Sequence, residues 1–216
     1  MIHLMRTLVT ICFALMVCTM NINAHGPFPD ESKRRELKRG EILITIDKHP
    51  ITNAFLPTGQ CLVEASVEDV WWIITDFDSF KEFLPHVVYY RPLFWKDDRL
   101  LVDCKVKLAF INYKYRLSYI IDESEHSTYW FYESGPIHDT QGYWRVEPFD
   151  GKHTLVTYTT TIDVGSAVPD FIEKKMAKST FPEIFHSLRS RVKELKIQGS
   201  LKRPQLPAKG TPPGGM

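Results

Sequence analysis

The segment from Glu64 to Pro85 constrains the fold most, because it holds two helix starts and a row of aromatic residues. Ser66 followed three positions later by Asp69 matches a capping box, in which side chains satisfy backbone N–H groups at a helix start. A helix is therefore predicted to begin near Val67. Its apolar residues recur at helical spacing, at Val67, Val70, Trp71 and Ile74.

A second short helix is predicted immediately afterwards. Asp76 and Asp78 end the first helix and offer a new N-cap before the apolar residues that follow, Phe80, Phe83 and Leu84. Two short helices therefore run in tandem.

Downstream, apolar and polar residues alternate with period two, which is typical of strands with one buried face. The clearest runs are residues 100–110 and 113–121. Further strands are predicted at 127–133, 142–146 and 154–164, and the isoleucines near position 44 form a first strand. Pro169 suits the first turn of a last helix, whose apolar stripe runs from Phe171 to Leu195.

These features resemble the START-like superfamily, in its polyketide cyclase/dehydrase and lipid-transport branch, which includes ubiquinone-binding proteins. The resemblance implies an α+β helix-grip fold, with a curved antiparallel sheet wrapped around a long C-terminal helix and two short helices after the first strand. Three motifs carry it in the family's order: Val70, Trp71, Asp76, Phe83, Leu84 and Pro85; Gly142, Trp144, Val146, Pro148, Gly151, Thr154 and Tyr158; and Gly165, Val168, Pro169 and Phe171.

The chain divides into four predicted segments. Residues 1–24, with Arg6, an apolar run and a terminal Ala24, have the layout of a secretory signal peptide, so the protein is expected to be periplasmic or secreted. Retention of this segment as an anchor is the alternative. A charged segment (25–39), the START-like domain (40–198) and a tail rich in Gly, Pro and Lys (199–216), predicted to be disordered, follow.

Charge and cysteine content exclude several function classes. Cleavage after residue 24 would leave 26 basic and 26 acidic side chains without a basic stripe, so nucleic acid is not an expected partner. The remaining Cys61 and Cys104 are interpreted as two separate buried thiols, with one disulfide between them as the alternative. No spacing predicts a metal site, no cofactor is implied, and no motif identifies a catalytic residue.

The resemblance implies an internal cavity that holds a hydrophobic small molecule: a lipid, an isoprenoid quinone or an aromatic compound. Such pockets are mostly apolar, with a few hydroxyls that fix orientation. The expected lining is Val106, Phe110, Tyr115, Leu117, Tyr119, Trp144, Val146, Tyr158, Ile162, Phe171 and Met176. The expected entrance is Phe83, Leu84, Pro85, His86 and His138.

Two other functions stay open at this point. A polyketide cyclase or dehydratase would need paired polar groups near Tyr119 and Tyr158. An interaction module would have a filled core and would recruit a partner through Trp72 and the basic tail. Trp72 shares a face with polar residues and is therefore expected to be exposed, with folding back over the core as the alternative. Trp72 is also a candidate for transient contact with a membrane surface.

Overall fold

Extended segments dominate the computed structural model, which describes residues 28–48, 55–108, 111–163 and 170–209. The predicted signal peptide lies outside the described residues. Residues 33–216 form one structural unit, and the fold below is that of this unit. No helix among the described residues is long and apolar enough to span a bilayer.

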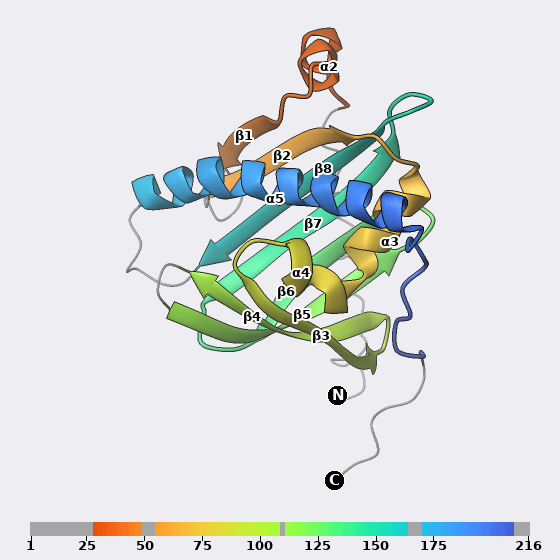
Figure 1. Cartoon of the computed structure of the whole chain (residues 1–216). Coiled ribbons are helices and arrows are strands. Elements are labelled where there is room, and N and C mark those ends of the chain that lie inside the picture. Colours follow the sequence, from red (N-terminus) through yellow and green to blue (C-terminus); the bar gives the residue numbers. More distant parts are fainter. Residues whose placement is uncertain (1–27, 49–54, 109–110, 164–169, 210–216) are drawn as a thin grey trace, which may run out of the picture. The chain divides into compact units, whose positions relative to one another are not determined.

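Eight antiparallel strands form one sheet in the order β1-β2-β8-β7-β6-β5-β4-β3, so that β1 and β3 are its edges. From β3 to β8 the strands follow one another as a meander, and β2 then pairs with β8. This curved antiparallel sheet confirms the predicted fold (Figure 1). The strands are β1 Leu43–Lys48, β2 Phe55–Val63, β3 Val87–Lys96, β4 Arg99–Leu108, β5 Ile111–Asp122, β6 Ser127–Ser134, β7 Asp139–Pro148 and β8 Thr154–Asp163.

The helices are α2 Glu31–Lys38, α3 Val67–Thr75, the 3-10 turn η1 Phe77–Ser79, α4 Phe80–Phe83 and α5 Asp170–Gln198. The predicted helix pair is present, and the Ser66 hydroxyl accepts a hydrogen bond from the backbone N–H of Asp69 at 3.1 Å. The long helix α5 lies across one face of the sheet, as Figure 1 shows. We call this the inner face.

Helix α5 approaches the sheet closely where β2 carries a glycine. A Cβ at Gly59 would overlap the rings of Phe181 and Phe185, so only a residue without a side chain fits under the helix here. The Arg189 guanidinium fastens α5 to β2 by donating to the Leu62 carbonyl at 2.9 Å. On the opposite, outer face, Leu62 and Leu155 form a small second core with Leu37 of α2 and Phe149.

Strand β3 is not among the strands predicted from the sequence. Its residues VVYYRPLFWK are rich in strand-forming types but do not alternate, because the pairing with β4 shifts register twice, between Val87 and Tyr89 and between Pro92 and Phe94. Bulges and a proline are common in edge strands. They hide the period-two signal on which the prediction depends.

The described part of the C-terminal tail, residues 200–209, contacts the folded domain. It contains no helix or strand, and Leu201 and Leu206 pack against the core. The Pro207 carbonyl accepts a hydrogen bond from Trp95 Nε1 at 2.7 Å, and Arg203 pairs with Glu123 at 2.6 Å. Prolines lower the entropy that such a segment loses on ordering, so few apolar anchors suffice.

Candidate functional site

The inner face carries a continuous row of aromatic rings that crosses four strands. Tyr119 of β5 lies 5.9 Å from Trp130 of β6, measured between ring centroids. Trp130 lies 5.8 Å from Tyr158 of β8, and Trp144 of β7 lies 4.1 Å from the same ring. Gly142 makes this row possible, because a Cβ at this position would overlap the ring of Trp130. The sequence therefore builds a broad apolar surface beneath α5.

Burial changes along the inner face. At one end, which we call the sealed end, Cys61, Val156, Phe185 and Leu188 are all 0% exposed and Val146 is 2% exposed. At the other, which we call the open end, the inner-face residues are only partly buried; they are Tyr90, Tyr113, Tyr132, Tyr158 and Ile162. The open end therefore presents aromatic and aliphatic side chains that are only partly buried.

A group of polar side chains lies within the apolar interior, on β3, β4 and β5. Tyr90 is paired with Cys104 across β3 and β4, and Cys104 with Tyr115 across β4 and β5. The side chain of Tyr119 interacts with that of Tyr90. We call these four residues the tyrosine cluster. The enzyme hypothesis required paired polar groups near Tyr119 and Tyr158, and this cluster lies at Tyr119.

Burial sets the protonation of the tyrosine cluster. It raises the pKa of Tyr90, Tyr115 and Tyr119 well above the ordinary range, and their mutual electrostatic interactions contribute further. Burial likewise raises the pKa of the Cys104 thiol to about 12, although hydrogen bonding to Tyr115 opposes the shift. The cluster is therefore neutral at physiological pH and can donate hydrogen bonds, but it is a poor proton acceptor.

Most of the predicted lining residues meet in one core cluster on the inner face. Val106, Tyr115, Leu117, Tyr119, Trp144 and Val146 are buried in it, and Tyr158 and Ile162 pack against it. Phe110 lies outside the described residues. Phe171 and Met176 lie in the first half of α5, where the structure describes the backbone but not their side chains.

The predicted entrance residues of the α4–β3 loop lie near α5. His86 has a positive φ of 66° and is exposed, and its Nε2 lies 3.8 Å from a carboxylate oxygen of Glu183 in α5. Phe83, Leu84 and Pro85 before it are partly buried. Exposed His138 lies elsewhere, beside the start of β7, with Nδ1 3.7 Å from a carboxylate oxygen of Asp163.

Trp72 is less exposed than its polar neighbours in the sequence suggest. It is partly buried and packs against the core. A shallow pocket beside it is lined by Ile121, Pro204 and Leu206, so the C-terminal segment covers much of its surroundings. The difference arises because sequence periodicity on α3 does not show contacts made by a distant segment. Contact of Trp72 with a membrane or partner stays a prediction.

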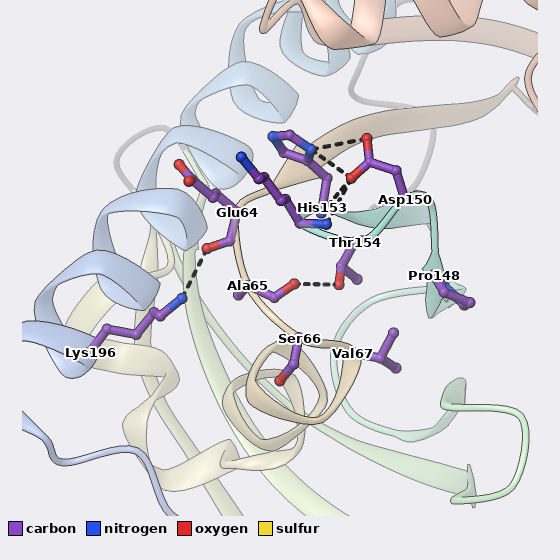
Figure 2. Close-up of a pocket in the computed structure, with 11 residues that line it drawn as sticks. Glu64, Ala65, Ser66, Val67, Pro148, Asp150, His153, Thr154 and Lys196 are labelled. Carbon is purple, nitrogen blue, oxygen red and sulfur yellow. Dashed lines mark hydrogen bonds and ion pairs between the residues drawn. The ribbon is translucent and has the colours of Figure 1, made fainter.

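A surface pocket of about 570 Å³ lies away from the predicted site, where α3 begins and the β7–β8 turn meets the end of α5 (Figure 2). Asp150 accepts hydrogen bonds from the backbone of Lys152 and His153, each at 2.9 Å, and pairs with the His153 ring. These bonds hold the pKa of Asp150 at about 2. The Lys196 ammonium donates to the Glu64 carbonyl at 3.2 Å.

The polar groups of this pocket thus hold together the β7–β8 turn, the connection from β2 to α3 and the end of α5. Thr154 Oγ1 donates to the Ala65 carbonyl at 2.8 Å, and the Ser66 hydroxyl is engaged at the start of α3. A shallow, polar junction of this kind does not match the apolar, enclosed surroundings that a hydrophobic ligand needs. The inner face remains the candidate site.

Cys61 and Cys104 are free and buried, on β2 and β4, as the sequence analysis favoured. Burial raises the pKa of the Cys61 thiol to about 12, with nearby Arg189 opposing the shift.

Arg145 points to the outer face, with Nε 3.2 Å from a carboxylate oxygen of Glu147. Within the described residues, no group of three or more His, Cys, Asp or Glu side chains could hold a metal ion.

This arrangement of sheet, helix and apolar inner face defines the helix-grip class of ligand-binding folds. The chain belongs to the family described as polyketide cyclase/dehydrase and lipid transport, whose pattern matches residues 63–189, more than half of the chain. This confirms the family that the three sequence motifs indicated. No curated protein matches the chain significantly.

Solved structures share the fold at low sequence identity. A START superfamily protein from Mycobacterium smegmatis superposes with a TM-score of 0.58 at 20% identity, covering 65% of this chain and 98% of that one. A STAR-related lipid transfer protein from Xanthomonas axonopodis gives 0.55 at 17%, covering 70% and 93%. Human StAR-related lipid transfer protein 5 gives 0.58 at 10%, covering 73% and 84%.

The predicted site left out two members of the tyrosine cluster, Cys104 and Tyr90. Cys104 was expected only as a buried thiol. Tyr90 was missed because strand β3 was not predicted, so nothing assigned this residue to the inner face. The signal that could have found it is the run Val87-Val88-Tyr89-Tyr90 between the Pro85 turn and the Asp97-Asp98 turn, which is rich in strand-forming residues. Alternation along that run does not tell which residues face inward, because the register shift after Val87 exchanges the two faces of the strand.

Proposed function

We propose that this protein is an exported carrier that holds a hydrophobic small molecule between the inner face of its sheet and α5. The observation that carries the proposal is the continuous apolar inner face, which is fully buried at the sealed end and only partly buried at the open end. A ligand that covers partly exposed apolar surface gains free energy of binding, at about 25 cal/mol per Å² of surface removed from water.

The family supports this proposal, because its description joins lipid transport with polyketide cyclisation. Two of the structural neighbours carry lipid transfer in their names. A lipid, an isoprenoid quinone or an aromatic compound would suit the lining, since large ligand pockets are mostly apolar with a few hydroxyl groups. Export to the periplasm or beyond rests on residues 1–24 and their secretory layout.

The test is native mass spectrometry of the protein purified from the export compartment of its own host, followed by organic extraction of the bound material. A stoichiometric lipid, quinone or aromatic compound is the expected result. An empty protein that also fails to take up fluorescent lipids would overturn the proposal and favour an interaction module with a filled core.

A pair of matched variants locates the binding. Val106→Phe places a larger side chain on the inner face, where Val106 is 9% exposed and pairs with Val87 and Tyr113. Ile120→Phe makes a comparable change on the outer face of β5, where Ile120 is 36% exposed. We expect the inner-face variant to lose bound ligand and the outer-face variant to retain it. Equal ligand content in both would place the ligand elsewhere.

A polyketide cyclase or dehydratase is the second candidate, and the tyrosine cluster is the observation that favours it. Hydroxyl groups that donate hydrogen bonds can polarise a carbonyl, as aromatisation chemistry requires. Proton abstraction needs a group with a pKa near the working pH, whereas burial raises the pKa of each cluster member above its usual value. The cluster therefore suits recognition better than turnover.

A further inference from the structure

The tyrosine cluster forms a compact polar patch because the strand register brings its members together. Tyr90, Cys104 and Tyr115 are consecutive partners across β3, β4 and β5, so their side chains leave the sheet side by side. Tyr119 lies four residues after Tyr115 on the same face and interacts with Tyr90. Four polar side chains from three strands thus meet on an otherwise apolar surface.

Aromatic rings from the helix pair enclose this patch. Phe80 of α4 lies 5.2 Å from the ring of Tyr90, and Phe77 of η1 lies 4.7 Å from the ring of Tyr119. Tyr115 and Tyr119 are 8% and 2% exposed, whereas Tyr90 is only partly buried. The patch therefore lies inside the fold but remains connected to the open end through Tyr90.

Among the buried inner-face residues that the structure describes, none carries a full charge. Arg145 is the only charged residue among the buried residues that the structure describes, and it lies on the outer face. The described inner-face positions of β4 and β5 are aliphatic residues, tyrosines and one thiol, at Leu100, Val102, Cys104, Val106, Tyr113, Tyr115, Leu117 and Tyr119.

The hydroxyls keep capacity for a further partner. Each phenol has one rotatable O–H donor and two acceptor positions, so an O–H that bonds within the cluster can turn toward a ligand carbonyl instead. The Cys104 thiol is directed at the protein, since its Sγ lies 3.2 Å from the Tyr115 carbonyl oxygen that accepts its hydrogen bond. A ligand is therefore expected to meet the phenols rather than the thiol.

We propose that the tyrosine cluster is a subsite for a neutral oxygen of the ligand, in particular the carbonyl oxygen of a molecule whose remainder is apolar. The proposal rests on the proposed function and specifies the ligand class. A carbonyl accepts hydrogen bonds from phenols without bringing a charge into the interior. A carboxylate or ammonium would lose its hydration with no buried opposite charge to compensate it, which is strongly unfavourable.

The test compares three probes of equal chain length: a long-chain methyl ketone, the corresponding fatty acid anion and the parent alkane. Affinities are measured by titration calorimetry on the ligand-free protein at neutral pH. The ketone is expected to bind about five-fold more tightly than the alkane, the effect of roughly one net hydrogen bond. The fatty acid anion is expected to bind more weakly than the ketone.

Two conservative variants test the assigned residues. Tyr119→Phe and Tyr90→Phe each remove one hydroxyl and keep the ring, so they are expected to weaken the ketone about five-fold and leave alkane binding unchanged. Tyr143→Phe is the matched control, because Tyr143 lies on β7 opposite Thr159, on the outer face. Thermal unfolding of each variant shows whether it folds.

Infrared spectroscopy tests directly whether the ligand carbonyl accepts a hydrogen bond from the tyrosine cluster. Isotope-edited infrared spectroscopy of a carbonyl-labelled ketone should show a lower stretching frequency in the protein than in alkane solvent, with a return toward the solvent value in Tyr119→Phe. Equal affinity for ketone and alkane, or tighter binding of the fatty acid anion, would overturn the subsite and leave the hydrophobic carrier standing. Failure of all three probes to bind would instead overturn the proposed function.

Discussion

The two ends of the inner face are built from the same strands and differ in what covers them. At the sealed end, the second half of α5 presses Phe185 and Leu188 onto the sheet, and both side chains are fully buried. At the open end, Tyr132, Tyr158 and Ile162 keep part of their surface accessible. In the proposed function, one end supplies stability and the other leaves apolar surface for a ligand.

This division has a general physical basis. Regions that bind ligands are drawn from the less stable parts of a fold, because a binding surface must be reachable and cannot bury all its apolar atoms. The sealed end can therefore be packed for stability without affecting recognition. Substitutions at the two ends should separate these contributions.

The largest expected effect is at the sealed end. Phe185→Ala removes a ring that is 0% exposed, lies 6.4 Å from the centroid of Trp144 and covers Gly59. Because the close-packed surroundings cannot fill the void, the free energy of unfolding is expected to fall by about 3–5 kcal/mol. Urea denaturation measures it, with Ile197→Ala, at a side chain 77% exposed, as the near-neutral control. A loss below about 1 kcal/mol would contradict a sealed core here.

Alkaline pH should lower the free energy of unfolding through one thiol at the sealed end and one in the tyrosine cluster. Burial raises the pKa of Cys61, at the sealed end, and of Cys104, in the tyrosine cluster, from 9.0 to about 12. Between these values the unfolded chain releases protons that the folded protein keeps, so stability falls as pH rises, by roughly 2 kcal/mol per thiol at pH 10.5. Urea midpoints from pH 7 to 10.5 measure the slope.

Replacing one thiol at a time separates the two contributions. Cys61→Ala and Cys104→Ala should each reduce the steepness of the decline, apart from their own cost in stability at neutral pH. Equal slopes in the wild-type protein and Cys104→Ala would show that water reaches the cluster freely. That result would place the tyrosine cluster nearer the solvent than its burial indicates.

The smallest expected effect is at the open end. Ile162→Ala removes a partly buried side chain at the end of β8, so the free energy of unfolding is expected to fall by only about 1 kcal/mol. The same substitution should weaken the binding of a hydrophobic probe, because it removes apolar surface from the proposed site. A loss as large as that of Phe185→Ala would erase the contrast between the two ends.

The sequence predicts the fold well because its strongest signals are local. The Ser66 cap, the alternation from Leu100 to Leu108 and the stripe of α5 each depend on neighbouring residues, and the structure contains each element. Strand β3 escaped prediction because its two register shifts break the alternation. The contacts of residues 200–209 with distant partners such as Trp95 are not revealed by any local pattern.

The sequence predicts which residues of β5 lie on the inner face, but it does not predict that the tyrosine cluster forms there. The alternation of side chains along the strand places Tyr115, Leu117 and Tyr119 on one face, and the structure buries all three in the same core. The meeting of Tyr90 with Cys104 requires the register of β3 against β4, and that register follows from a bulge. The sequence likewise does not show which end of the face stays partly uncovered, since that depends on where α5 approaches the sheet.

The edge strand β3 has a consequence for how molecules of this protein meet at high concentration. An unpaired sheet edge is a template on which another chain can add a strand and begin aggregation. Pro92 cannot donate a backbone hydrogen bond, and the two bulges distort the edge on either side of it. The C-terminal segment further occupies Trp95 near the end of β3. The irregularities that hid this strand from prediction thus also discourage edge-to-edge self-association.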